Sequence, residues 1–165
     1  MSRKKVHILL IGPLPNLTAN KIGGARVSFS ELVQQLEQRQ YPFQLINTKP
    51  FDRGWKRWAN PLLIVMAFFQ KVWQCEVVFL NVSQGGTKTL APLLYVFCKA
   101  LNKKLVFRPF GGSLKAYYEK YPNWQKWIFH QTILKADLFF LQTKELVQFF
   151  KPIGGQIKQL PTSRP

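Results

Sequence analysis

Short apolar runs alternate along the chain with longer stretches in which apolar positions recur every three or four residues. Short continuous runs are typical of strands buried on both faces, and the longer spacing is typical of amphipathic helices. The runs predict six strands, at residues 6–11, 43–47, 76–80, 105–107, 137–141 and 156–160. The longer stretches predict helices at residues 25–38, 61–73, 89–101, 124–135 and 144–150.

This alternation predicts an α/β fold: a Rossmann-like, three-layer domain with a mostly parallel sheet and right-handed crossovers. Residues 81–88 are expected to form a polar, glycine-bearing loop. Residues 1–160 are predicted to form one domain. Residues 161–165 form a basic turn flanked by prolines, which indicates the start of a linker to a further domain.

Two glycine pairs follow predicted strands. Gly23-Gly24 precedes the helix at 25–38, and Gly111-Gly112 follows the strand at 105–107. Glycine has no Cβ, so an anionic ligand can approach the backbone, and a helix start offers unpaired N–H groups and a positive dipole end. The two loops together predict one crevice at the carboxyl edge of the sheet. A tight turn without a ligand is the alternative at each pair.

The chain is strongly basic. Its 165 residues carry 24 Lys and Arg against 7 Asp and Glu, a formal net charge of +17. That balance implies an anionic partner: nucleic acid, an anionic membrane surface or a phosphorylated substrate. The hydrophobic content of 47% argues against disorder.

The cysteines and the longest apolar run are expected to be structural. Cys75 and Cys98 lie in apolar stretches without metal-ligand spacing, so we expect buried, free thiols and no metal site. The apolar run at 61–69 falls short of the roughly 18 residues of a membrane-spanning helix. The basic N-terminus leads into a strand without a small-residue cleavage site, so we expect a cytoplasmic protein.

Three motifs carry a family resemblance, together with the Gly-Gly loop that follows the first strand. They are Arg108-Pro109-Phe110-Gly111-Gly112-Ser113, the stretch from Ala136 to Thr143, and the closing Leu160-Pro161-Thr162-Ser163-Arg164-Pro165. In their order and spacing they resemble the N-terminal half of a family 4 glycosyltransferase with the GT-B fold. The resemblance covers nearly the whole chain.

This resemblance implies an acceptor-binding domain that faces a second domain, which holds most of a nucleotide-sugar. It further implies retaining sugar transfer without an obligatory metal or cofactor. The leaving diphosphate would be stabilised by backbone amides and basic side chains. The second domain would be supplied in the same chain or by a partner subunit, and this fragment alone would be inactive.

The resemblance also implies roles for individual residues. Gly23 and Gly24 match the loop that approaches the phosphate and sugar of the donor. Arg108, Gly111, Gly112 and Ser113 would line the acceptor side of the cleft, with an ordinary salt bridge or surface role as the alternative for Arg108.

The sequence departs from the family at one point. Many members carry a histidine near the end of the fourth strand, which here reads Arg108-Pro109-Phe110. His7 is expected in the core or at the sheet edge, and His130 on a helix surface or in packing. Neither is assigned an acid–base role, so the catalytic residue stays unknown.

Cations and tryptophans interleave at Trp55, Lys56, Arg57 and Trp58. Tryptophan favours the membrane interface and Lys or Arg favours anionic head groups. We therefore expect these four residues to dock the protein on the inner leaflet, close to a glycan or lipid-linked acceptor. A solvated loop whose tryptophans pack on the core is the alternative.

Other classes of function fit less well. A basic, non-catalytic binding domain for nucleic acid or an anionic membrane remains an alternative, although the sequence shows no known nucleic-acid motif. A dinucleotide-dependent oxidoreductase needs GxGxxG directly after the first strand and an acidic residue after the second, where Asn47 stands. No GK[ST] motif is present, which excludes a P-loop.

Overall fold

The computed structural model describes residues 6–14, 24–48, 60–110 and 113–160. The chain divides into two compact units, Met1–Phe79 and Leu80–Pro165. Each unit is described by itself below.

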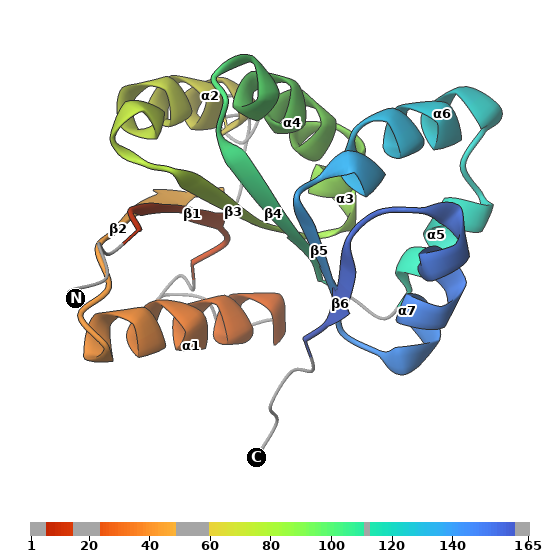
Figure 1. Cartoon of the computed structure of the whole chain (residues 1–165), viewed down its shortest axis with the longest axis horizontal. Helices are drawn as coiled ribbons and strands as arrows, with labels where there is room; N and C mark the ends of the chain where they lie inside the picture. The colour runs from red at the N-terminus through yellow and green to blue at the C-terminus, as the bar shows by residue number, and fades with distance from the viewer. Residues whose placement is uncertain (1–5, 15–23, 49–59, 111–112, 161–165) are drawn as a thin grey trace. The chain divides into compact units, whose positions relative to one another are not determined.

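The strands form one parallel sheet (Figure 1). They are β1 (Ile8–Gly12), β2 (Phe43–Asn47), β3 (Val77–Val82), β4 (Lys104–Pro109), β5 (Leu138–Leu141) and β6 (Ile157–Gln159). The strand order is β2-β1-β3-β4-β5-β6. The predicted α/β fold is confirmed. The chain places β2 on one side of β1 and then returns to add β3 and the later strands on the other side of β1. The flavodoxin-like variant of doubly wound sheets has the same strand order.

Seven α-helices and three short 3-10 helices occur in the described residues. The α-helices are α1 (Gly24–Gln38), α2 (Asn60–Lys71), α3 (Gln84–Lys88), α4 (Leu90–Ala100), α5 (Leu114–Glu119), α6 (Asn123–Gln131) and α7 (Lys144–Phe150). The 3-10 helices are η2 (Val72–Gln74), η3 (Ile133–Lys135) and η4 (Lys151–Ile153). All five predicted helices and all six predicted strands are therefore present; β2 and α7 have the predicted ends, and the ends of the others are shifted.

The predicted loop at 81–88 is wrong. Asn81 and Val82 continue β3, and Gln84–Lys88 is the short helix α3. A Cβ at Gly86 would lie 3.0 Å from Cβ of Val82, so α3 turns tightly against the strand that it leaves. Gly86, one of the two glycines that suggest a loop, thus permits a close approach of helix to strand.

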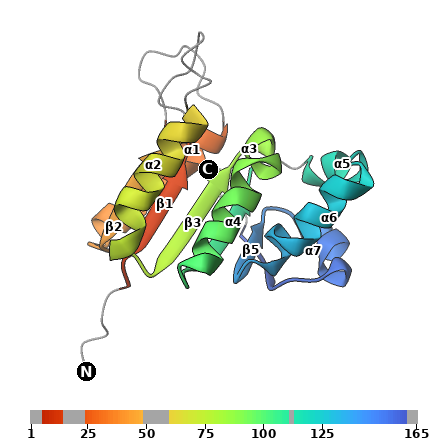
Figure 2. The same cartoon turned by 90° about the horizontal axis from the view of Figure 1, so that it is seen from above.

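The first unit packs α1 and α2 on opposite faces of β1 and β2 (Figures 1 and 2). Buried Leu10, Phe29 and Val33 form its core cluster with partly buried neighbours from both strands and α1. His7 lies exposed just before β1, and its carbonyl accepts hydrogen bonds from the N–H groups of Glu76 and Val77 at 3.0 and 3.4 Å. It therefore lies at the amino end of the sheet and outside the core.

Aromatic side chains dominate the core of the second unit. Phe107 on β4 and Phe139 on β5 pack with ring centroids 5.3 Å apart. Phe129 of α6 and Phe150 of α7 both contact Phe139, with centroids 6.4 and 6.0 Å away. Helices α6 and α7 thus cover the same face of β5.

Candidate functional site

Helix α1 begins at Gly24, the described member of the first glycine pair; Gly23 lies outside the described residues. Gly24 is exposed, and a Cβ added to it would meet nothing within 4 Å. The first turn of α1 carries no acidic residue and includes Arg26. The positive end of the helix dipole and a nearby cation both favour an anion.

Gly12 has a different role, which the sequence did not reveal. A Cβ at this last residue of β1 would come within 2.6 Å of the Phe29 ring, and Phe29 is fully buried. Gly12 therefore allows α1 to pack directly on the strand. Its carbonyl also accepts a hydrogen bond from the N–H of Thr48 at 3.0 Å, which ties together the ends of β1 and β2.

Asn47 ends β2 at the position where a dinucleotide enzyme has an acidic residue. Its Oδ1 accepts a hydrogen bond from the N–H of Leu14 at 3.2 Å. The side chain thus braces the backbone that leaves β1. This structural use agrees with the exclusion of a dinucleotide-binding site.

Arg108 lies inside the sheet on β4 and is only 4% exposed. The alternative of a surface role for Arg108 is therefore wrong. Its guanidinium carbon lies 4.9 Å from the centroid of the Phe110 ring, an arrangement typical of a cation–π contact. Gly111 and Gly112 lie outside the described residues, and Ser113 is exposed directly before α5. The cleft formed by these four residues stays a prediction.

Asn81 was expected in a polar loop and lies instead in β3. It is fully buried on β3, the strand next to β4. Neither polar atom of its amide has a hydrogen-bond partner in the described part of the chain. Such unmet capacity costs about 1–3 kcal/mol. Asn81 therefore brings unused hydrogen-bonding groups to the carboxyl half of the sheet in the second unit.

A pocket lies among α3, α4 and α6 in the second unit. Its enclosed space is about 20 Å³, room for roughly one water molecule. The residues that line it are mostly aromatic or apolar: Thr87, Lys88, Pro92, Tyr121, Trp124, Gln125, Ile128 and Phe129. Sequence reasoning missed this pocket, because its walls come from segments as far apart in the chain as Thr87 and Phe129, and each of their side chains alone is typical of ordinary core or surface.

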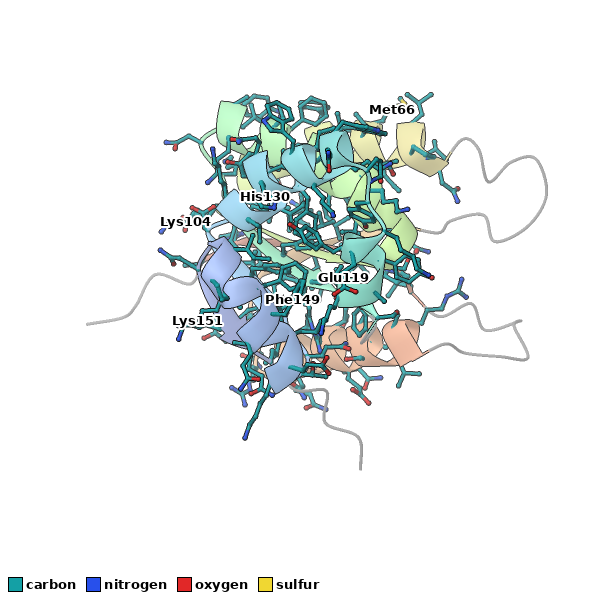
Figure 3. The ribbon with its side chains drawn as sticks, turned by 90° about the vertical axis from the view of Figure 1, so that its right-hand side faces the viewer. Met66, Lys104, Glu119, His130, Phe149 and Lys151 are labelled. Carbon is teal, nitrogen blue, oxygen red and sulfur yellow. The ribbon has the colours of Figure 1, made fainter. Side chains whose placement is uncertain are left out.

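His130 belongs to a packed aromatic cluster beside this pocket. Its Nε2 lies 2.5 Å from the hydroxyl oxygen of Tyr118, and the two rings stack at 22°. Tyr118 also contacts Phe149 and Phe150 of α7, with centroids 5.9 and 5.3 Å away. Figure 3 shows His130 on α6 and Phe149 on α7. His130 is thus a packing residue, as expected.

Helix α2 presents an apolar surface to the outside in addition to its buried one. Its buried residues include Ile64 and Phe68. The exposed residues form a stripe that runs into η2: Leu62, Leu63, Met66, Phe69 and Trp73. Figure 3 shows Met66 pointing away from the ribbon. The expected docking residues Trp55, Lys56, Arg57 and Trp58 precede this helix and lie outside the described residues.

Neither a protein-family model nor a curated protein matches the chain. Within the described residues, no helix has the length and apolar character needed to cross a membrane. The same part of the chain brings no three His, Cys, Asp or Glu side chains together as a metal site.

Proposed function

We propose that this chain is the acceptor-side, N-terminal domain of a retaining, family 4 GT-B glycosyltransferase that works at a membrane surface. The proposal rests on the resemblance of its motifs and on the parallel α/β fold. The observation that carries it is the start of α1 at Gly24, where open space, an absence of acidic residues in the first turn and the helix dipole coincide.

The start of α1 would assist the reaction electrostatically. When a sugar leaves its nucleotide, negative charge develops on the diphosphate, and fixed N–H dipoles stabilise that charge in the transition state. Gly23 and Gly24 would donate backbone N–H groups, and Arg26 adds a positive charge in the same turn. Basic side chains can stabilise this negative charge in place of a metal ion. The nucleotide-sugar is a co-substrate, and its remaining contacts would come from the second domain.

Gly24→Ala tests this assignment, because the structure offers no steric objection to the methyl group. The native polypeptide, isolated from its source, is assayed for release of nucleoside diphosphate from a panel of nucleotide-sugars. We expect release by the wild type and a loss of about tenfold or more in Gly24→Ala, since the methyl group would keep phosphate from the backbone. Val27→Ala, exposed one turn further along α1, is the matched control. No release with any donor, or equal losses in both variants, would overturn the proposal.

The membrane part of the proposal rests on the exposed apolar stripe of α2. Leu62, Met66 and Trp73 are 64%, 53% and 65% exposed. Large exposed apolar patches mark interaction surfaces, and an apolar helix face beside cations is typical of binding in the plane of a bilayer. The 15-residue stretch of α2 and η2 contains no acidic residue. With the net charge of +17, these features favour an anionic lipid surface as the partner.

A basic, non-catalytic binding domain is the alternative, and the net charge of +17 supports it. Nucleic-acid binding would be recognised by its steep dependence on salt. Salt-sensitive binding of DNA or RNA, combined with no effect of Gly24→Ala on any ligand, would favour this alternative.

A further inference from the structure

Helix α6 lies on the side of the second unit that faces the viewer in Figure 3, and it exposes two tryptophans. Trp124 and Trp127 are 62% and 64% exposed. They stand three positions apart, so their side chains are neighbours on one face of the helix. On the far side, Phe129 is 2% exposed and packs on Phe150, with ring centroids 5.8 Å apart. The core therefore holds α6 in place while two indoles remain outside.

Cations surround these two indoles. Lys120 is exposed just before α6, and Lys135 is exposed just after it. Nζ of Lys135 donates a hydrogen bond to Oε1 of Gln131 at 2.6 Å, which holds this charge against the last residue of the helix. Lys126 stands between the tryptophans in the sequence, and no acidic residue occurs from Lys120 to Ala136. This surface of the second unit is therefore both apolar and positive.

Exposed indoles flanked by cations fit the headgroup region of an anionic bilayer. Tryptophan prefers the depth of the headgroups, and lysine ammonium groups are attracted to anionic lipids. A helix that lies flat in the interface inserts side chains of one face to a similar depth, which suits Trp124 and Trp127. A second copy of the chain is disfavoured as the partner, because each copy carries a net charge of +17 and the two repel each other.

Single-stranded nucleic acid is the main competing partner, because its bases stack on aromatic rings and its phosphates attract cations. Such binding uses a groove that follows the nucleic-acid backbone. The pocket that adjoins α6 encloses only about 20 Å³, which is far too little for a base. A bilayer needs no groove, and the exposed face of a helix is sufficient.

We propose that the exposed face of α6 docks on an anionic bilayer. The indoles of Trp124 and Trp127 enter the interface, and the ammonium groups of Lys120 and Lys135 lie against lipid phosphates. This is a second docking surface, in addition to the apolar stripe of α2 in the first unit. It rests on the membrane part of the proposed function and does not depend on sugar transfer.

Co-sedimentation of the whole chain with phosphatidylglycerol vesicles tests the two indoles. Trp124→Ser/Trp127→Ser should lower partitioning by about tenfold or more, because two large apolar side chains no longer enter the interface. Trp124→Phe/Trp127→Phe keeps two aromatic rings and should recover most of that loss, which separates lost contact from lost folding. Val27→Ser/Tyr41→Ser is the matched control, because it removes two apolar side chains of the first unit that are 43% and 44% exposed. This control should bind as the wild type does.

Lys120→Gln/Lys135→Gln tests the cations. This variant should weaken binding to phosphatidylglycerol vesicles by about tenfold and leave the weaker binding to phosphatidylcholine vesicles unchanged. Lys104→Gln/Lys158→Gln removes the same charge from exposed positions on β4 and β6. It should weaken binding by about threefold at most, because charges away from the contact act only through screened, long-range attraction. Equal losses in the two lysine variants would overturn the assignment of Lys120 and Lys135 to the contact.

The stripe of α2 is tested beside α6, so that the two surfaces can fail separately. No binding of the wild type to phosphatidylglycerol vesicles would overturn both. Loss of binding in Leu62→Ser/Met66→Ser but not in Trp124→Ser/Trp127→Ser would overturn the α6 surface alone. The reverse pattern would support α6 and overturn the stripe of α2. If the tryptophan variant lost binding to oligothymidine but kept binding to vesicles, the α6 surface would belong to single-stranded nucleic acid and the proposal would be wrong.

Discussion

The Oδ2 atom of Asp137 accepts a hydrogen bond from the backbone N–H of Leu105 at 2.8 Å. The same oxygen lies 2.8 Å from Nζ of Lys99. Leu105 is fully buried near the start of β4, Lys99 lies in the last turn of α4, and Asp137 directly precedes β5. One carboxylate thus joins three elements of the second unit, α4, β4 and the start of β5.

Removal of this carboxylate should destabilise the fold. Asp137→Ala leaves the N–H of Leu105 without its acceptor, and we expect a loss of about 1–2 kcal/mol in the free energy of unfolding. Most of this loss in free energy comes from the hydrogen bond donated by the Leu105 N–H, because the ion pair with Lys99 is more than one-third exposed and contributes little. Asp137→Asn keeps an acceptor oxygen and should lose less than half as much. Equal losses in urea titrations of the two variants would contradict this division.

The same group makes stability depend on pH. Burial raises the pKa of Asp137, but hydrogen bonds from Lys99 and Leu105 and the charge of Lys99 together bring it below the usual value of 3.8. A lowered pKa in the folded state means that the contribution is fully present above about pH 4 and is lost as the pH falls through the folded pKa. Urea titrations between pH 6 and pH 2 should therefore show a smaller acid-induced loss for Asp137→Asn than for the wild type. Identical pH profiles would refute the linkage.

Gly12→Ala should destabilise the fold, whereas Gly24→Ala should not. The new Cβ at Gly12 would lie 2.6 Å from the fully buried Phe29 ring, so overpacking should cost about 1–3 kcal/mol. The new Cβ at Gly24 meets open space at the first residue of a helix, where alanine is the better helix former. Calorimetry should show Tm lowered by about 2–10 °C for Gly12→Ala and unchanged or raised for Gly24→Ala. A lowered Tm in both variants would mean that Gly24 has a structural role.

The sequence predicts the order of elements well because buried strands need apolar side chains on both faces. The α7 helix has the predicted ends, Lys144 and Phe150, because a threonine precedes it and accepts the hydrogen bond from the N–H of Leu146 at 3.2 Å. The errors arise where tertiary packing overrides local preference. Asn81 is polar yet fully buried in β3, and Gly86 permits a helix where two glycines suggest a loop.

The candidate sites were less predictable than the fold. Gly24 could be proposed from a local pattern, since a glycine before an amphipathic helix is itself the signal. The pocket depends on how Lys88 and Trp124 come together from separate elements, which no local pattern encodes. The exposed apolar stripe of α2 could not be predicted from the sequence for a related reason. Its buried residues are equally apolar, so the sequence does not distinguish the side that packs from the side that faces outward.

The cysteines should be unreactive in the folded protein. Cys75 and Cys98 are both buried, and neither forms a disulfide, as the sequence predicts. Burial raises the pKa of the Cys98 thiol to about 12, so almost no thiolate is present near pH 8. A thiol-specific reagent should therefore label neither residue in the native protein and both in guanidinium chloride. Cys75→Ser isolates the signal of Cys98, and rapid native labelling of that variant would show that the helix carrying Cys98 opens easily.

Binding to anionic vesicles should depend on the exposed face of α2. The double variant Leu62→Ser/Met66→Ser removes two exposed apolar side chains from that face. If each contributes about 1 kcal/mol on entering the bilayer interface, partitioning should fall by about tenfold or more. Leu93→Ser/Val96→Ser on α4 is the matched control, with exposures of 41% and 53%. Co-sedimentation with phosphatidylglycerol vesicles measures the effect. Equal losses in the two variants, or no preference for anionic over neutral vesicles, would rule out this docking surface.

Tyr121→Phe should leave the stability of the fold unchanged or raise it. The hydroxyl of Tyr121 is buried and has no hydrogen-bond partner within the described residues, so its removal should relieve a desolvation cost. We expect Tm to be unchanged or raised by about 2–4 °C, the shift that corresponds to 1 kcal/mol in a chain of this size. A Tm lowered by several degrees would show that the hydroxyl already has a partner in the folded chain.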